Sequence, residues 1–228
     1  MKKTRKSNKV IFANKSESLH SLFQDVVQKI LGKTVHFYQR IDKRGVRVTE
    51  VNNKQLVEKL LIILPTWRRK PYEDGSYPPV RIPTFIRKTK KCVLRKVLQV
   101  MFSCDGSVVL GVKWHKTKNT WVFTRRIQIT VAHPQLRENL REILEDLGFS
   151  PKIWRREIII NKKDELLKFK REIGFIDGVK VSRKSRYWAG RNKNEVLTLL
   201  IKSFELSAKM LKKCKSRDEV MKLLSSRS

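Results

Sequence analysis

The order of predicted secondary-structure elements occurs twice in this chain, and this repetition restricts the fold more than any other feature. Each copy consists of a short apolar strand, an amphipathic helix that ends at a glycine, a pair of strands, and a second amphipathic helix. The stretches NNKQLVEKL (residues 52–60) and NKKDELLKF (residues 161–169) occupy the same position in the two copies. The sequence therefore predicts an α+β fold made of two similar units.

The first copy is predicted to extend to residue 64. Its elements are a strand at 10–12, a helix at 16–31 that Asn14 caps and Gly32 closes, a hairpin of strands 34–38 and 46–51, and a helix that starts at Asn52 or Asn53.

The second copy is longer at its beginning. Its elements are a strand at 127–131, a helix that begins at Pro134 and is closed by Gly148, strands at 152–155 and 157–160, and a helix from residue 161 that ends before Gly174. A further helix at 93–103 and a strand at 108–115 precede it, whereas only residues 1–9 precede the first copy. The first copy therefore lacks its leading helix and strand.

This pattern predicts four regions. They are a truncated first unit with a basic N-terminal arm (1–64), a basic linker (65–91), a second unit (92–192), and C-terminal helices (193–228). The last amphipathic stretch, residues 208–224, is predicted to lie on the surface.

The charge of the chain restricts its partners. The net charge is +32, from 53 Lys and Arg against 21 Asp and Glu. Adaptation of the surface to heat would add acidic residues that pair with the basic ones, and here these acids are missing. Self-repulsion of this size favours a polyanionic partner, so the composition predicts binding to nucleic acid.

The remaining composition excludes several classes of protein. No run of 18 apolar residues could cross a membrane, and the N-terminus MKKTRK lacks the apolar core of a secretory signal. Cys92, Cys104 and Cys214 are odd in number and widely spaced, which fits neither a disulfide framework nor a zinc site. We therefore expect a protein of the reducing cytoplasm.

One stretch carries a specific resemblance. Residues 94–108 read LRKVLQVMFSCDGSV, which is an apolar helix that ends in Asp105-Gly106-Ser107. Together with RIPTFI (81–86) and the glycine-closed helices, this stretch resembles the LAGLIDADG homing-endonuclease family, of the kind found free-standing or inside inteins in archaea. The resemblance implies two αββαββα units with saddle-shaped antiparallel sheets that lie in the major groove of DNA. It also implies that each motif helix delivers one carboxylate to Mg²⁺, as in-line cleavage of a phosphodiester requires.

The sequence departs from the family pattern in three places. Only Asp105 remains as a motif carboxylate, because the first motif helix is missing. Val100 and Cys104 stand where small residues usually allow two motif helices to approach. Val80, followed by Arg81, occupies the position that often carries a lysine. These departures indicate a protein that binds nucleic acid and has lost most or all of its nuclease activity.

Two loop sequences imitate the end of the motif. Asp74 in EDGS and Asp177 in IDG are each followed by glycine, but neither ends an apolar helix, so neither is expected to replace the missing carboxylate. For Asp105 itself, two interpretations remain open: a surviving Mg²⁺ ligand, or the last residue of a packed helix with Gly106 in its cap.

Candidate residues for nucleic-acid binding are basic, polar or aromatic and lie in four segments. In the N-terminal arm they are Lys2, Lys3, Arg5 and Lys6; in the linker Arg68, Arg69, Lys70, Arg81, Arg87 and Lys88; in the central hairpin Lys113, His115, Arg125, Arg126, Gln128 and Thr130; and in the basic stretch near the C-terminus Arg183, Lys184, Arg186, Tyr187, Trp188 and Arg191.

Three functions fit these features to different degrees. The favoured one is binding of structured RNA, such as ribosomal or intron RNA in a ribonucleoprotein particle, or of duplex DNA. The alternative is an active site-specific homing endonuclease that cleaves double-stranded DNA with Mg²⁺, as a dimer or with a partner that supplies the second motif helix. A transcription regulator is the third, but the sequence has no recognisable helix-turn-helix.

Overall fold

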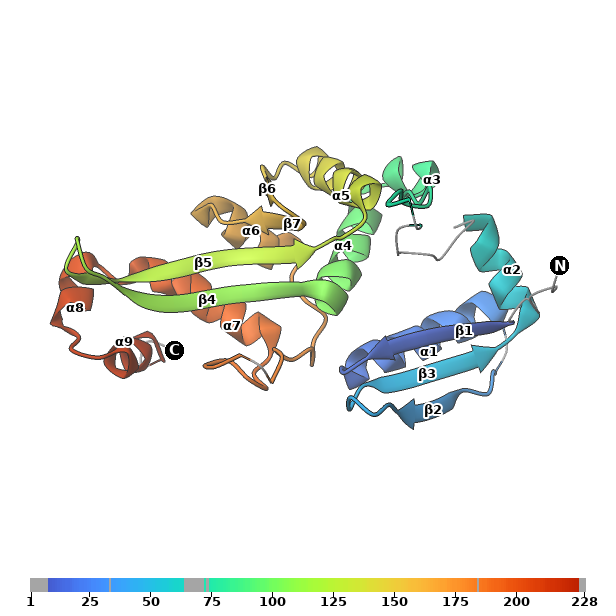
Figure 1. Ribbon diagram of the computed structural model, residues 1–228, viewed down its shortest axis with the longest axis horizontal. Coiled ribbons are helices and arrows are strands. Elements are labelled where there is room, and N and C mark those ends of the chain that lie inside the picture. Colours follow the sequence, from blue (N-terminus) through green and yellow to red (C-terminus); the bar gives the residue numbers. More distant parts are fainter. Residues whose placement is uncertain (1–7, 33, 64–71, 73, 184, 226–228) are drawn as a thin grey trace. The chain divides into compact units, whose positions relative to one another are not determined.

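The computed structural model describes residues 8–32, 34–63, 72, 74–183 and 185–225. The chain divides into two compact units, Met1–Arg87 and Lys88–Ser228. Each unit contains an antiparallel sheet with helices packed against it (Figure 1). The predicted α+β fold with antiparallel sheets is therefore confirmed. Within the described residues, no helix combines the length and the apolar character needed to cross a membrane.

The first unit is built on a three-stranded sheet in which β3 lies between β1 and β2. Its elements are β1 (Lys9–Asn14), α1 (Glu17–Leu31), β2 (Tyr38–Ile41), β3 (Arg47–Asn52), α2 (Lys54–Ile63) and α3 (Thr84–Arg87). The centre of its core consists of Val27, Val51 and Leu56, one each from α1, β3 and α2. The apolar faces that the sequence pattern predicts for the two helices and the strand pack against one another in this cluster.

The second strand of this unit is displaced from its predicted position. It spans Tyr38–Ile41 instead of residues 34–38. The Asp42 carboxylate accepts hydrogen bonds from the backbone N–H groups of Arg44 and Val46, both at 2.9 Å, and so forms a tight turn. Because such a turn joins directly paired strands, β2 must end immediately before Asp42.

The helix ends of the first unit follow the sequence with one exception. Gly32 adopts the left-handed conformation that closes α1 (φ 63°), as predicted. The Asn53 side chain accepts a hydrogen bond from the Leu56 N–H at 2.8 Å and begins α2. Asn14, in contrast, accepts from the N–H of Ser16 at 2.9 Å, and Ser16 is the N-cap residue of α1.

The second unit is built on a four-stranded sheet with the order β4-β5-β7-β6. Its elements are α4 (Lys91–Asp105), β4 (Gly106–His115), β5 (Thr120–Thr130), α5 (Pro134–Asp146), β6 (Lys152–Trp154), β7 (Glu157–Ile160), α6 (Lys163–Glu172), α7 (Lys193–Lys202), a short 3₁₀ helix (Ser203–Glu205), α8 (Ala208–Lys213) and α9 (Arg217–Ser225). The predicted strand at 127–131 is the end of the much longer β5.

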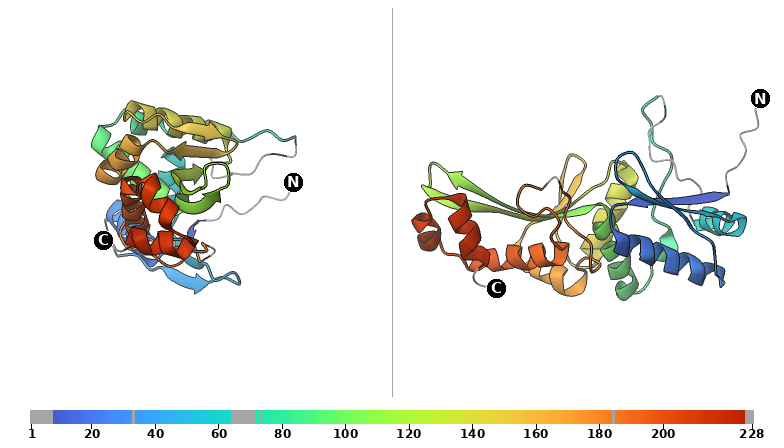
Figure 2. Two further views of the ribbon diagram at one scale, coloured as in Figure 1. Left: turned by 90° about the vertical axis from the view of Figure 1, so that its left-hand side faces the viewer. Right: turned by 90° about the horizontal axis from the view of Figure 1, so that it is seen from below.

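The C-terminal helices cover one side of this sheet. In Figure 2 (right), α7, α8 and α9 lie along one side of the long β4–β5 hairpin, and α7 and α9 contact β4 while α8 contacts β5. Leu211, Val220 and Leu224 are buried there. The prediction that residues 208–224 lie on the surface is therefore wrong, because their few apolar residues share one face of each helix and complete the core.

The two sheets have the same connectivity over three strands. In the first unit β1 pairs with β3 and β3 with β2, and in the second unit β5 pairs with β7 and β7 with β6. Helix α1 follows β1 as α5 follows β5, and α2 follows β3 as α6 follows β7. Within the described residues, the first unit has no counterpart of α4 and β4.

Candidate nucleic-acid interface

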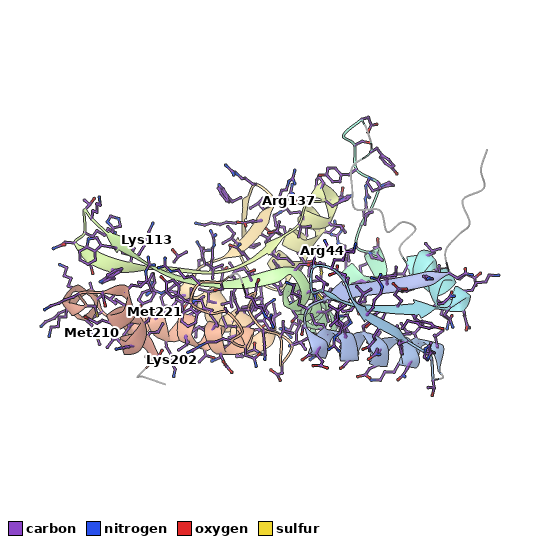
Figure 3. The ribbon with its side chains drawn as sticks, turned by 60° about the horizontal axis from the view of Figure 1, so that its bottom comes forward. Arg44, Lys113, Arg137, Lys202, Met210 and Met221 are labelled. Carbon is purple, nitrogen blue, oxygen red and sulfur yellow. The ribbon has the colours of Figure 1, made fainter. Side chains whose placement is uncertain are left out.

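Strand β4 separates apolar from polar side chains. Val108, Leu110 and Val112 are buried on the side that the helices cover, whereas Ser107 and Lys113 are exposed on the other side. Figure 3 shows Lys113 on the hairpin, and Lys202, Met210 and Met221 on the helices α7, α8 and α9. We call the uncovered side of the sheet β4-β5-β7-β6 the open face.

Strand β5 contributes the polar centre of the open face. Ile127 and Ile129 are buried toward the helices, so Arg126, Gln128 and Thr130 project to the open face, as the alternation predicts. The cross-strand register aligns Arg126 with Val109 and Gln128 with Ser107. His115 and Lys113 lie on the same face toward the tip of the hairpin.

Arg125 lies on the opposite side from its neighbour Arg126. Its Nε donates to the Ser203 hydroxyl at 2.6 Å and its Nη2 to the Ser203 carbonyl at 2.7 Å. Its guanidinium also lies over the rings of Phe123 and Phe204, 4.6 and 4.4 Å from their centroids. Burial lowers the pKa of Arg125. Because these groups occupy its guanidinium, Arg125 is not part of the open face.

A polar cluster joins β5 to β7 on the open face. The Gln128 side-chain N–H₂ donates to the Glu157 carboxylate at 3.0 Å. Three further atoms, Arg126 Nε, Gln128 Oε1 and Glu157 Oε2, are buried and have no hydrogen-bond partner among the described residues. Unpaired buried polar atoms cost free energy, which a ligand that reaches them after a small side-chain rotation would recover.

The edge strand β6 adds residues that the sequence predictions did not include. Trp154 pairs with Glu157, and Lys152 pairs with Ile159, so both lie on the open face. The Trp154 side chain is 54% exposed. The signal that could have identified it is its position directly before the turn Arg155-Arg156 of a short hairpin, at the end of a strand.

Asp105 is the last residue of α4, and its side chain is exposed. The helix passes directly into β4 at Gly106, which has an extended backbone and no left-handed cap. A Cβ atom at Gly106 would lie 2.6 Å from the Phe102 carbonyl oxygen, so glycine is required here by close approach. Glycine was expected here because of a left-handed helix cap, whereas the structure requires it because the backbone of Phe102 leaves no room for a Cβ atom.

A buried lysine holds the end of α4. The Lys193 ammonium group, at the start of α7, donates to the carbonyl oxygens of Ser103 (2.8 Å) and Gly106 (2.7 Å) and approaches that of Phe102 (3.4 Å). The residue is only 7% exposed. Burial lowers its pKa to about 8, although nearby Cys104 and Asp105 act in the opposite direction. A cation at a helix C-terminus also interacts favourably with the helix dipole.

The described residues do not fit a complete metal centre. Among them, no group of three or more His, Cys, Asp or Glu side chains is placed to hold a metal ion. Asp74 accepts hydrogen bonds from Ser76 in its own turn, and Asp177 accepts one from Asn194 at 3.0 Å. Asp74 is therefore held within its own turn and Asp177 is tied to α7, while α4 supplies Asp105 as a single carboxylate.

The basic stretch near the C-terminus is a loop held against β4. The indole N–H of Trp188 donates to the Leu110 carbonyl at 2.7 Å, and Trp188 is buried. The Tyr187 hydroxyl accepts a hydrogen bond from Arg217. These two aromatic residues thus anchor the loop, while its exposed cations are Arg183, Arg186 and Arg191.

The other basic candidates are scattered. Arg81 and Lys88 are exposed, and Arg87 ends α3. The candidates that lie outside the described residues are Lys2, Lys3, Arg5, Lys6, Arg68, Arg69, Lys70 and Lys184. The first unit also has exposed residues that the predictions missed, namely Tyr38 and Arg40 on β2, with Arg40 2.9 Å from Glu50.

A helix that ends in an exposed aspartate and leads directly into a four-stranded antiparallel sheet can be compared with known proteins. Residues 93–174 match the family model of the LAGLIDADG-like domain. The predicted resemblance to the LAGLIDADG family is therefore confirmed for this part of the chain, and α4 stands at the beginning of the matched residues.

Several solved structures are similar to this chain, and the two with a TM-score of 0.50 show the same fold. A variant of the homing endonuclease I-DmoI in complex with its target DNA and Mg has 16% sequence identity and a TM-score of 0.50, over 76% of this chain and 84% of that chain. I-DmoI in complex with DNA and Ca has 16% sequence identity and a TM-score of 0.50, over 76% of this chain and 78% of that chain. Full-length DUF199/WhiA from Thermotoga maritima has 14% sequence identity and a TM-score of 0.46, over 96% of this chain and 59% of that chain. No curated protein sequence matches this chain.

Proposed function

We propose that this LAGLIDADG protein binds double-helical nucleic acid through the open face of the sheet β4-β5-β7-β6 and does not cleave it alone. The observation that carries this proposal is the separation of the two sides of the sheet. Most buried apolar side chains face the helices, whereas the open face carries Lys113, Arg126, Gln128 and Thr130, with Val109 and Ile159 between them. Cationic groups suit phosphates, and amide and hydroxyl groups suit base edges.

The charge of the whole chain supports a polyanionic ligand. A net charge of +32 is offset when basic side chains neutralise phosphates and release condensed counterions. Glu157 is the exception on the open face, and a carboxylate there suits an exocyclic amino group of a base better than a phosphate. The centre of the face therefore suits base edges, and its margins suit the backbone.

The absence of cleavage follows from the donor set. In-line displacement at a phosphodiester is catalysed by metals that clamp the attacking and the leaving oxygen. Mg²⁺ in such sites is held by carboxylates. Helix α4 supplies Asp105, and among the described residues no group of three or more His, Cys, Asp or Glu side chains is placed to hold a metal ion. We therefore assign no metal-dependent step to this chain by itself.

The binding surface can be tested with two matched double variants. Lys113→Ala/Arg126→Ala removes two cations from the open face, whereas Lys209→Ala/Lys212→Ala removes two exposed cations from α8, which packs on the other side of the sheet. With duplex DNA and hairpin RNA as probes, we expect the first variant to bind about tenfold more weakly, with a slope of log K against log salt about two units shallower. Equal losses in both variants would contradict the proposed surface.

Cleavage is tested separately. Wild-type protein and the Asp105→Asn variant are incubated with duplex DNA and Mg²⁺ or Mn²⁺, and their affinities are measured in the same buffer. We expect no cleavage by either protein and the same affinity for both. Metal-dependent cleavage by the wild type that is lost in Asp105→Asn would contradict this proposal and would identify the protein as an active endonuclease.

The class of nucleic acid is tested by sequencing what co-purifies with the protein from its native cells without nuclease treatment. Enrichment of defined RNA supports an RNA-binding role, and a discrete duplex DNA site supports a DNA-binding role. Recovery of no nucleic acid above background would contradict both roles.

A further inference from the structure

Trp154 is an exposed aromatic residue at the edge of the sheet of the second unit. It is the last residue of the edge strand β6, on the open face, beside Glu157 of β7. Its side chain is 54% exposed. The next large apolar residue, Ile153, points to the other side because side chains alternate along a strand. On the open face, Trp154 therefore has Glu157 opposite it and Lys152 and Ile159 next to that pair.

The residue that follows Trp154 is held in an unusual backbone conformation. Arg155 is the first residue of a two-residue turn between β6 and β7, and its φ is 54°. Glycine or asparagine usually occupies such a position, because a side chain there costs about 1–2 kcal/mol. The hairpin itself gains nothing from an arginine at this point.

The arginine acts on the tryptophan. Its guanidinium carbon lies 4.7 Å from the centroid of the Trp154 ring, which is a cation–π arrangement. One ring face is thus occupied by a cation, and the exposed part of the ring stays available. A planar group could stack on the free face of this ring, whose orientation the arginine already fixes. The positive charge of Arg155 would then lie close enough to interact with a nearby phosphate.

Only one kind of ligand on a nucleic acid satisfies this arrangement. A stacked base pair inside a continuous double helix does not offer the face of its base, whereas a bulged, looped or terminal base does. Stacking of an unpaired base on an aromatic ring, with Arg beside it, is a common mode of RNA recognition.

We propose that Trp154, fixed by Arg155, stacks on an unpaired base next to the helix bound by the open face, and that the substrate class is folded RNA. This inference rests on the proposed function, because the open face must bind the helix for the base to reach the edge strand. Unpaired bases flanking short helices are regular features of folded RNA, whereas a continuous DNA duplex does not supply them.

The test uses two RNA duplexes of the same sequence, one fully paired and one with a single bulged nucleotide. The full-length protein and its Trp154→Ala variant are titrated with both. We expect wild-type protein to favour the bulged RNA, and Trp154→Ala to lose about 5- to 100-fold on this probe and less than twofold on the paired one. Trp154→Phe keeps a ring and should retain most of the preference.

Stacking is observed directly with 2-aminopurine as the bulged base. Its fluorescence should be quenched by wild-type protein and by Trp154→Phe, but not by Trp154→Ala. The Arg155→Gly variant relieves the left-handed strain, so it should be at least as stable as the wild type and should still bind the bulged RNA more weakly. This pairing separates a loss of binding from a loss of folding.

Several outcomes would overturn the inference. They are an equal affinity of wild-type protein for paired and bulged RNA, an equal loss of both probes in Trp154→Ala, and quenching that persists in Trp154→Ala. If Lys113→Ala/Arg126→Ala weakens both probes while Trp154→Ala weakens neither, the proposed function stands and this inference fails.

Discussion

Lys193 couples the stability of the second unit to pH. Its ammonium group is buried at the end of α4, and its pKa is lowered from 10.5 to about 8, mainly by burial. Between these two values the unfolded chain binds a proton that the folded chain has released. The free energy of unfolding therefore rises with pH across this interval, by about 2–3 kcal/mol for this one group.

The measurement is urea denaturation at pH 7 and pH 10 for the wild type and for Lys193→Met. Other lysines titrate equally in both proteins, so the difference between them isolates Lys193. We expect the wild type to gain stability relative to the variant as the pH rises. A constant difference between the two proteins would show that Lys193 is not charged and buried in the folded state.

Gly106 and Gly111 provide a matched pair on one strand. A Cβ at Gly106 would lie 2.6 Å from the carbonyl oxygen and 2.8 Å from Cα of Phe102, so Gly106→Ala must displace the junction of α4 and β4. A Cβ at Gly111 would meet Thr124 at an ordinary 3.6 Å. Thermal unfolding should show a loss of about 1–3 kcal/mol for Gly106→Ala and little change or a small gain for Gly111→Ala.

At the scale of the element, the two arginines of β5 have opposite roles. Arg125→Ala removes two hydrogen bonds to Ser203 and exposes the rings of Phe123 and Phe204, so it should lower the free energy of unfolding by about 2–4 kcal/mol. Arg126→Ala should leave stability almost unchanged and weaken binding to nucleic acid. Urea denaturation and filter binding on the same two variants distinguish these effects, and a reversed pattern would mean that the faces of β5 are assigned wrongly.

Apolar residues at a spacing of two or of about 3.6 predicted most strands and helices, because each element buries one face and leaves the other in contact with solvent. The alternation of Ile127 and Ile129 predicted the buried side of β5, and Gly32 and Gly148 predicted where helices end. The same alternation places Arg125 on the buried side, but it cannot show that the chain brings a hydroxyl and two rings to its guanidinium. That information lies in Ser203 and Phe204, far along the sequence.

Other elements escaped prediction because their signals are local or weak. The β2 strand was displaced by the side-chain hydrogen bonds of Asp42, which override the apolar pattern around it. Helices α8 and α9 are short and carry several charged residues, so their few apolar residues (Leu211, Val220 and Leu224) do not by themselves predict burial. They are buried because α8 contacts β5 and α9 contacts β4. Trp154 was missed because an aromatic residue in a strand usually indicates core.

At the scale of the whole molecule, the chain combines a larger unit that contains the LAGLIDADG-like match with a smaller unit. The second unit contains the motif helix, the four-stranded sheet and the C-terminal helices that cover it, and most of the fully buried large side chains belong to it. The first unit has a core centred on Val27, Val51 and Leu56. This difference in core size predicts a difference in stability between the units.

A fragment that comprises residues 88–228 should therefore fold alone. Because its sheet is covered by α7, α8 and α9 without help from the first unit, we expect a single cooperative transition in urea and the circular-dichroism spectrum of an α+β protein. It should also keep most of the affinity for bulged RNA, since the open face and Trp154 both lie within it, while the cations of the first unit are lost. A fragment that folds but does not bind would move the binding surface to the first unit, and one that fails to fold would show that the two cores are interdependent.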